Sequence, residues 1–420
     1  MNDGHTRAEE LPSHARANGA RLRELAALFL KLGAISFGGP AAHIALLEGE
    51  IVRKRQWVTR QQFLDMLGAA NLIPGPTSTE MAISVGFVRA GWAGLCVAGA
   101  GFILPAAVIT AGFAWLYVRF GALSQAVPAL GGVKAAVIAV IAIAIWRLGK
   151  TAVKDLGLAM LGGLSLGAFF LGVNPIAILF GGGLLGMLAR RAASARATGA
   201  LLVLPVLSGR TFQTSTVGRT LISWLSWSGT LALASAAAGM APVRPSVYKI
   251  GLFFLKVGAV LYGGGYVLLA FLEQGIVQQH AWLTHQQLLD AVAIGQFTPG
   301  PVLSTATFIG YLVGGVPGAA VATVAIFLPS FFYVALLAPI LFRLRQSTWM
   351  AGFLDSINVC AVALMGGVTF KLGADALRGW PAWGIAALSL AALLRWKVSP
   401  AWVVLGGGLA GLALAAFHLG

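Results

Sequence analysis

Apolar segments of about 20 residues follow one another along almost the whole chain, and this feature limits the fold more than any other. A helix needs about 20 apolar residues to cross about 30 Å of hydrocarbon. Only 10% of the 420 residues are charged, whereas roughly a quarter are charged in a soluble domain. The sequence therefore predicts an all-α polytopic membrane protein with about 12 or 13 spans. Candidate spans lie near residues 25–47, 63–89, 92–118, 124–147, 156–173, 175–189, 220–241, 250–272, 288–314, 316–342, 354–373, 379–395 and 400–418.

The formal net charge of +16 comes mainly from Lys and Arg residues between the apolar segments. Such loops are typical of a chain held in a lipid bilayer. We expect no nucleic-acid binding, because no basic face with interleaved aromatic residues is present. Cys96 and Cys360 lie in apolar stretches, where a thiol is usually a packing residue. Residues 1–24 lack the apolar core of a signal peptide, so we expect the first hydrophobic helix to direct insertion.

An internal duplication organises the chain. Residues 29–76 align without a gap with residues 254–301, and about 21 of the 48 positions are identical. After a one-residue deletion the match continues through Pro105 and Pro329 to the end of each half. The sequence therefore predicts two homologous halves of about six transmembrane segments each. The predicted units are a polar N-terminal segment (1–24), a first membrane repeat (25–189), a basic connector with an extra transmembrane segment (190–249) and a second membrane repeat (250–420).

The loop charges indicate how the two halves are oriented. The loop at 48–62 carries Arg53, Lys54, Arg55 and Arg60, whereas its counterpart at 273–287 has no Lys or Arg. Opposite sides of the membrane would explain this difference under the positive-inside rule. The basic connector at 190–219 should then face the cytoplasm too, which simple helix counting does not allow. We therefore expect inverted repeats that contain broken or re-entrant helices, as in many transporters.

Each half contains two places where a membrane helix should break. One is Ser36-Phe37-Gly38-Gly39-Pro40, matched by Leu261-Tyr262-Gly263-Gly264-Gly265, and the other is a Pro-Gly-Pro motif at 74–76, matched at 299–301. Proline removes an amide donor and glycine permits unusual dihedral angles. A broken helix offers free amides and a positive dipole end that suit an anion, although hydroxyl groups there can also act only as N-caps. The candidate oxyanion ligands are Ser36, Gly38, Gly39, Asn71, Pro74, Gly75, Thr77, Ser78, Thr79, Gly263, Gly264, Gln296, Gly300, Ser304 and Thr305.

Three cations could add positive potential to such a site. Lys31 and Lys256 occupy matched positions within apolar helices, where a Lys at mid-membrane costs roughly 2.5–3.5 kcal/mol. Arg89 follows the first broken segment. The alternative for the lysines is that their side chains extend to the membrane interface.

Carboxylates are scarce, yet two pairs recur in both halves: Glu48 with Glu273, and Asp65 with Asp290. An intramembrane carboxylate is the usual carrier of a coupled proton. The alternative is structural, with Glu48 capping the stretch that follows it and Asp65 pairing with nearby basic residues. Glu80, just after the first Pro-Gly-Pro, and His43, which the second half replaces with Leu268, are the other candidate proton-coupling residues.

Two further motif matches carry little weight. Residues 163–167 fit the G-x-S-x-G pattern of serine hydrolases and residues 181–186 fit G-x-G-x-x-G, but both lie in glycine-rich apolar helices. The sequence contains no Walker A motif, no H-E-x-x-H and no metal-ligand cluster. We therefore expect neither an enzyme nor a protein that needs a metal or cofactor.

The pattern FLKLGAISFGGPAAHIALLEGEIVRKRQWVTRQQFLD…NLIPGPTSTEMAISVG resembles the chromate ion transporter family, and the resemblance covers essentially the whole chain. The chain departs from the family pattern at Gly265 and Leu268, and at Lys134, where an Asn like Asn358 is more typical. The family motif falls on Gly38, Gly39, Pro40, His43, Glu48, Trp57, Asp65, Pro74, Gly75 and Pro76.

The resemblance implies a multi-pass protein of the bacterial inner membrane that exports chromate, a tetrahedral dianion like sulfate, and so confers chromate resistance. It also implies that the proton-motive force drives export, as in an antiporter, with protons as the coupling ion. Uptake or exchange of sulfate or a related oxyanion is the alternative, and a homodimer is an open possibility for the assembly. Together with the helix breaks, the resemblance suggests alternating access around a midplane oxyanion site, with Glu48 or Glu80 carrying the proton.

Overall fold

The computed structural model describes residues 10–37, 39–121, 126–197, 245–262, 267–337, 348–396 and 398–418, and these residues form helices and connections without a β-strand. This confirms the all-α prediction for the described part of the chain. The predicted span at 220–241 and the candidate ligands Gly38, Gly263 and Gly264 lie outside the described residues.

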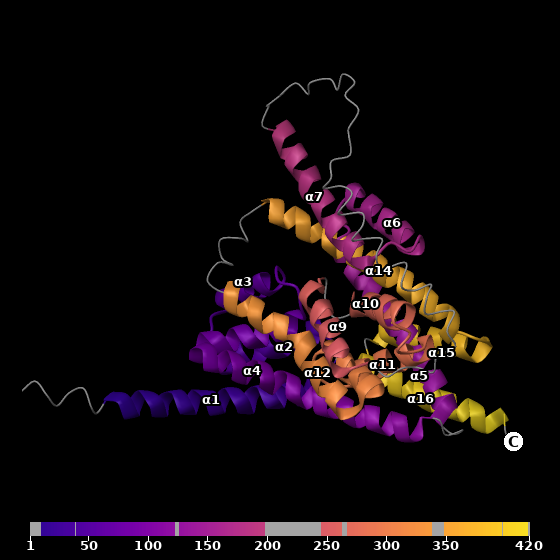
Figure 1. The fold of residues 1–420 in the computed structure, drawn as a ribbon, viewed down its shortest axis with the longest axis horizontal. Helices are drawn as coiled ribbons and strands as arrows, with labels where there is room; N and C mark the ends of the chain where they lie inside the picture. The colour runs from indigo at the N-terminus through magenta and orange to yellow at the C-terminus, as the bar shows by residue number, and fades with distance from the viewer. Residues whose placement is uncertain are drawn as a thin grey trace, which may run out of the picture.

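The described helices of the two halves follow the same order (Figure 1). The first half comprises α1 (Glu10–Ile35), α2 (Pro40–Leu47), the π-helical η1 (Glu48–Lys54), α3 (Arg60–Ala70), α4 (Thr77–Phe120), α5 (Ala126–Ala152), α6 (Leu156–Phe170) and α7 (Pro175–Ala197). The second comprises α9 (Val247–Val260), α10 (Leu268–Leu272), η3 (Glu273–Gln279), α11 (His285–Phe297), η4 (Val302–Ser304), α12 (Thr305–Leu337), α14 (Thr348–Ala376), α15 (Trp380–Ala391), η5 (Ala392–Trp396) and α16 (Pro400–His418).

The duplication extends to local backbone geometry. Thr59 caps α3 and Thr284 caps α11, each through a capping box with the Gln three residues later. Just before these caps, Gln56 and Ala281 both adopt a left-handed conformation with φ of 50°. Few non-glycine residues do so, and the two lie at matched positions. The halves are therefore structural repeats as well as sequence repeats.

Both long helices, α4 and α12, are hairpins. The helical dihedral angles are interrupted at Ala90 and Gly91 in α4 and at Gly315 in α12. A Cβ atom on Gly86 would overlap the carbonyl of Gly94, although residues eight apart are about 12 Å apart in a straight helix. The chain therefore reverses at these glycines, which agrees with the predicted boundaries between residues 89 and 92 and between 314 and 316.

Some predicted spans were wrong as single helices. The span at 25–47 is divided between α1 and α2, and the span at 63–89 is divided by the turn at 71–76. The first arm of α4, residues 77–89, is only about 20 Å long at 1.5 Å per residue, which is short of a membrane crossing. The spans at 250–272 and 288–314 are divided at the matched places. Proline and glycine end the helices there, as the predicted breaks require.

The two repeats interlock. Within each repeat, α1 packs on α4 and α9 packs on α12, and α4 also packs on α12 across the repeats. The remaining helices exchange partners: α5 packs on α15 and α16, whereas α14 packs on α6 and α7 (Figure 1). The repeats are therefore held together by a shared interior.

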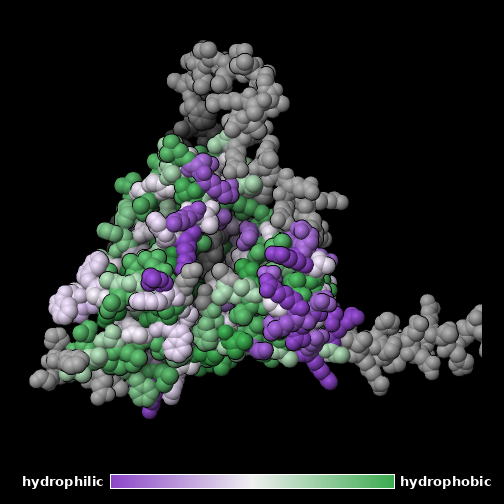
Figure 2. All heavy atoms as spheres, turned by 180° about the vertical axis from the view of Figure 1, so that it is seen from behind, coloured by the Kyte–Doolittle hydropathy of each residue, from purple (hydrophilic) through white to green (hydrophobic). Residues whose placement is uncertain are grey.

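The outer surface suits lipid. Four described helices are long and apolar enough to cross a membrane, Thr77–Phe120, Val127–Ala152, Val302–Leu336 and Ala351–Ala376, two of them being the hairpins above. Large apolar side chains point outward, including Leu171, Leu156 and Trp380, which are 86%, 77% and 74% exposed. Figure 2 shows apolar residues over most of one face and hydrophilic residues gathered on the side where α1 leaves the body. Water would not tolerate so much exposed hydrocarbon.

Candidate functional site

The Pro-Gly-Pro loop of each repeat contacts the broken helix of the other repeat. The Gly75 amide donates a hydrogen bond to the Leu261 carbonyl at 2.7 Å, and the Gly300 amide donates to the Ser36 carbonyl at 2.8 Å. Ser36 and Leu261 are the matched residues that directly follow the ends of α1 and α9, so the two contacts are related by the internal repeat. The four predicted breaks are therefore joined in two pairs across the repeats, and we call these two contacts together the crossing.

Glycine is required at both contacts. Gly75 and Gly300 have positive φ angles of 145° and 88°, which side-chain-bearing residues rarely adopt. A Cβ atom on Gly300 would overlap the side chain of Ala106 and approach the Gly33 carbonyl, and one on Gly75 would overlap the Glu80 carboxylate and the Ser330 hydroxyl. The crossing is therefore packed so closely that backbone and side chains of both repeats line it.

Buried polar atoms without partners gather near the first Pro-Gly-Pro loop. Glu80 is fully buried, and neither of its carboxylate oxygens has a hydrogen-bond partner within the described residues. The same holds for the hydroxyl groups of Thr79 and Ser330, and the Ser304 hydroxyl after the second Pro-Gly-Pro motif is likewise buried without a partner among the described residues. Leaving one such group unpaired costs about 1–3 kcal/mol, so several together indicate a site for a polar ligand.

His43 joins the crossing from α2. Its Nε2 atom lies 3.0 Å from the Ser36 carbonyl that also accepts from Gly300. A carbonyl can only accept, so Nε2 carries the proton, and Nδ1 has no partner among the described residues. Leu268 fills the matched position in the second repeat and is buried. The two sides of the crossing therefore differ in chemistry.

The other predicted oxyanion ligands are placed differently. Gly39 caps α2 with φ of 80°, and Ser78 is buried at the start of α4. Asn71 is exposed and accepts a hydrogen bond from Thr77 at 3.3 Å. Thr305 donates to the Val302 carbonyl at 2.8 Å, which is the capping role, and it lines a small cavity with Gln296. Pro74 begins the loop that carries Gly75.

The three predicted cations do not meet at the crossing. Lys31 is exposed on α1, within electrostatic range of Glu50. Lys256 is exposed and lines a separate cavity beside α9. Arg89 forms an ion pair with Glu24 at 3.3 Å. The polar groups at the crossing are therefore backbone amides, hydroxyls, the His43 imidazole and one carboxyl.

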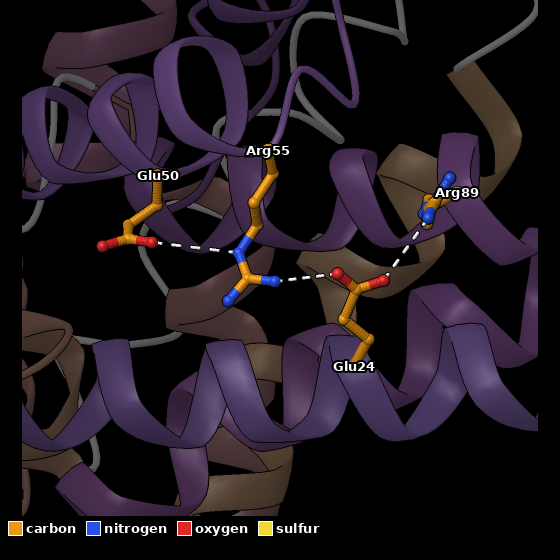
Figure 3. A network of polar contacts seen from close by, with 4 residues as sticks. All are labelled: Glu24, Glu50, Arg55 and Arg89. Atoms are coloured by element: carbon orange, nitrogen blue, oxygen red, sulfur yellow. Dashed lines mark hydrogen bonds and ion pairs between the residues drawn. The ribbon is translucent and has the colours of Figure 1, made fainter.

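Arg89 belongs to a surface network that the sequence did not reveal (Figure 3). Glu24 accepts from Arg55 at 2.8 Å and from Arg89 at 3.3 Å, and Arg55 also lies 3.8 Å from Glu50. Both guanidinium groups stack over Trp57, at 5.3 and 5.1 Å from its ring centre. The hydrogen bond from Lys54 lowers the pKa of Glu50. This network fastens α1, η1 and the turn of the α4 hairpin to one another.

The recurring carboxylates occupy different environments. Glu48 is partly exposed and lies 3.5 Å from Arg53 and 3.9 Å from Arg60. Its counterpart Glu273 is fully buried, 3.1 Å from the His285 Nδ1 atom, and it also accepts from Gln278 at 3.2 Å. Asp65 accepts a hydrogen bond from Gln61 at 3.2 Å.

Asp290 takes part in a buried ion pair between the repeats. Lys134 of α5 lies 3.1 Å from one Asp290 oxygen, and Tyr117 of α4 donates to the other at 2.8 Å. Lys134 also donates to Gln286 at 2.7 Å. This cluster accounts for the unusual Lys134, which lies where the second repeat has Asn358. The role of Tyr117 was missed because only tertiary packing brings α4 to α11.

Comparisons with known proteins agree with the repeat. The family model described as "Chromate transporter" matches residues 23–187 and again 248–412. The chain is 33% identical to the "Chromate transport protein" of Cupriavidus metallidurans over 93% of this chain and 92% of that protein. It is 31% identical to the "Probable chromate transport protein" of Synechococcus elongatus (90% of each chain) and to the "Chromate transport protein" of Pseudomonas aeruginosa (92% and 91%). No solved structure matches the chain.

Proposed function

Because this chain belongs to the chromate transporter family, we propose that it carries chromate out of the cytoplasm across the bacterial inner membrane and so confers chromate resistance. The observation that carries the proposal is the crossing, where two Pro-Gly-Pro loops and two broken helices meet. Amides and hydroxyls can bind a tetrahedral dianion without adding fixed charge. The unpartnered hydroxyls of Thr79, Ser304 and Ser330 are the groups available for it.

The crossing also suits alternating access. Among the described residues, one backbone hydrogen bond joins each loop to the opposite repeat, whereas the repeats are joined elsewhere by long packed helices. Breaking one contact while keeping the other would open the site to one side of the membrane. This is the movement expected when a site lies between two structural repeats.

The electrical part of the proton-motive force is sufficient to drive export. Moving one charge across 100 mV is worth about 2.3 kcal/mol, so the two charges of chromate gain about 4.6 kcal/mol when the inside is negative. An anion at the crossing faces Glu80, and an ionised carboxylate would repel it. We therefore assign to Glu80 a proton that the carboxyl keeps while the anion binds and crosses; because this proton does not leave with the anion, both charges of chromate count toward the driving force. The antiport that the family resemblance implies is the alternative, in which proton and anion exclude each other.

Radiochromate flux into everted vesicles tests the driving force. An imposed potential without a pH difference should support uptake, and a pH difference alone should change the rate only modestly. Uptake that persists unchanged after both gradients are removed would contradict any coupling to the proton-motive force. Excess unlabelled sulfate in the same assay separates a chromate carrier from a general carrier of tetrahedral dianions.

Glu80→Gln tests the proton role. The variant keeps a neutral, similarly shaped side chain, so we expect flux driven by potential to remain and its pH dependence to disappear. Glu50→Gln, at a carboxylate on the surface network, is the matched control and should keep the wild-type pH profile. Retention of the full pH dependence in Glu80→Gln would remove Glu80 from this role.

A further inference from the structure

A cavity of about 770 Å³ lies beside α9 and extends to Val260, the residue before Leu261 of the crossing. Lys249 and Lys256 line it from α9, and being seven residues apart they lie on one face of the helix, two turns from each other. His280 and Gln274 line it from the second repeat, and Asn174 lines it from the turn before α7 in the first. Both repeats therefore contribute donors to this cavity.

The charge of the cavity is positive. No carboxylate is among its described lining residues, and within the described part of the chain neither lysine has an ion-pair partner. Burial lowers the pKa of His280, and the nearby charges of Lys249 and Lys256 lower it further. The imidazole stacks on Trp282 with ring centres 4.6 Å apart, and both rings line the cavity.

In the first repeat an ion pair occupies the position that matches this cavity. Glu24 occupies the position of Lys249, and Arg55 occupies the position of His280. In the first repeat these two residues form the 2.8 Å ion pair at the centre of the surface network (Figure 3). In the second repeat the acid is replaced by a lysine, so the equivalent pair cannot form and the surface is left open and cationic. The replacement of Glu24 by Lys249 therefore removes the matched ion pair and leaves a lysine along the cavity.

We propose that this cavity is a binding site for a tetrahedral oxyanion, with Lys249 and Lys256 pairing with its charge and side-chain amides donating hydrogen bonds. Lysine ammonium groups bind such oxyanions as point charges. The inference rests on the proposed function and deepens it, because a cationic cavity next to the crossing would collect the anion before transport. The same chemistry would also hold the phosphate of an anionic lipid, and the experiment below separates the two sources.

Equilibrium binding of radiochromate to the full-length protein tests the site directly, in nanodiscs of zwitterionic lipid at low ionic strength. We expect Lys249→Gln/Lys256→Gln to raise the dissociation constant at least tenfold, and Lys249→Arg/Lys256→Arg to restore binding. Lys150→Gln/Arg395→Gln removes the same number of charges away from the cavity and should bind like the wild type. A second set of nanodiscs contains phosphatidylglycerol, and the anionic lipid that co-purifies with each variant is measured.

Chromate binding that depends on the lysines in zwitterionic nanodiscs supports a site for the free anion. Lysine-dependent retention of phosphatidylglycerol without chromate binding assigns the site to a lipid phosphate. If the double Gln variant binds both anions like its charge control, the proposal is overturned. Flux measurements on the same proteins keep the two proposals distinct. If the wild-type protein transports chromate but binding does not depend on the lysines, only the cavity proposal is contradicted. If the wild-type protein does not transport chromate but binding depends on the lysines, only the transport proposal is contradicted.

Discussion

Replacing Lys134 with Met tests whether the buried ion pair holds the two repeats together. Lys134 and Asp290 are 3.1 Å apart, and their side chains are only 13% and 3% exposed. At an effective dielectric constant of 20, two charges at that distance attract each other by about 5 kcal/mol before desolvation is counted. Removing one partner of such a pair typically costs 3–5 kcal/mol. We expect about 3 kcal/mol for Lys134→Met, the lower end, because Tyr117 still donates to Asp290.

A double-mutant cycle isolates the interaction. Asp290→Asn should cost about 1–3 kcal/mol, because Lys134 keeps its hydrogen bond to Gln286. The double variant Lys134→Met/Asp290→Asn should lose much less than the sum, since no unpaired charge is left buried. Unfolding in mixed micelles by titration with SDS gives the free energies. Lys150→Met, in which a lysine stacked on Trp146 at 4.6 Å is lost, should cost less than about 1 kcal/mol.

Two results would refute this reasoning. A loss below about 1 kcal/mol for Lys134→Met would mean that the buried carboxylate does not depend on its lysine. Additive effects in the double variant would mean that the two side chains stabilise the protein independently. Either result would show that this ion pair does not hold the two repeats together.

Two further predictions concern the crossing and the surface network. Gly300→Ala should lower stability by about 2–5 kcal/mol and abolish flux, because the left-handed backbone and the overlap with Ala106 both oppose a Cβ atom. The control Gly384→Ala places a Cβ atom in open space and should unfold at the wild-type temperature or slightly above it. Equal behaviour of both variants would contradict the steric argument. The pKa of Glu50 is lowered in the folded protein, so its stabilising contribution is present at neutral pH and is lost as pH falls through this lowered pKa. Glu50→Gln or 1 M salt should reduce the dependence of the unfolding free energy on pH in this range, by less than about 1 kcal/mol for an exposed pair. An unchanged pH dependence would contradict a stabilising role for the Lys54 contact.

The predicted helix breaks show how far sequence reasoning reached. Proline and glycine act on the backbone nearest to them, so the turns at residues 36–39 and 71–76 could be placed without a structure. The hairpin turns at Gly91 and Gly315 were likewise located to within a few residues. Proline and glycine positions did not predict that α4 reverses direction, because the reversal depends on the close contact of Gly86 with Gly94 across the hairpin.

The candidate site shows the limit of the same reasoning. Glu80, Thr79 and Ser304 were predicted from their positions after the Pro-Gly-Pro motifs, and they are buried near the crossing. Ser330 was missed, because nothing in its own segment indicates that it lies next to Gly75. Lys31 and Arg89 were grouped with the anion site because of their positions in apolar segments beside the helix breaks, whereas the structure pairs Arg89 with Glu24 and leaves Lys31 exposed on α1.

The sequence by itself determined that the chain is helical, apolar enough for a membrane, duplicated and broken at four places, because composition, periodicity and proline or glycine act locally or can be compared along the chain. Only the tertiary structure decided which breaks meet, which helices exchange partners between repeats, and that Asp290 pairs with Lys134. These features depend on contacts between residues more than 100 positions apart in the chain. Such contacts are selected by shape and burial over the whole molecule, and no local pattern records them.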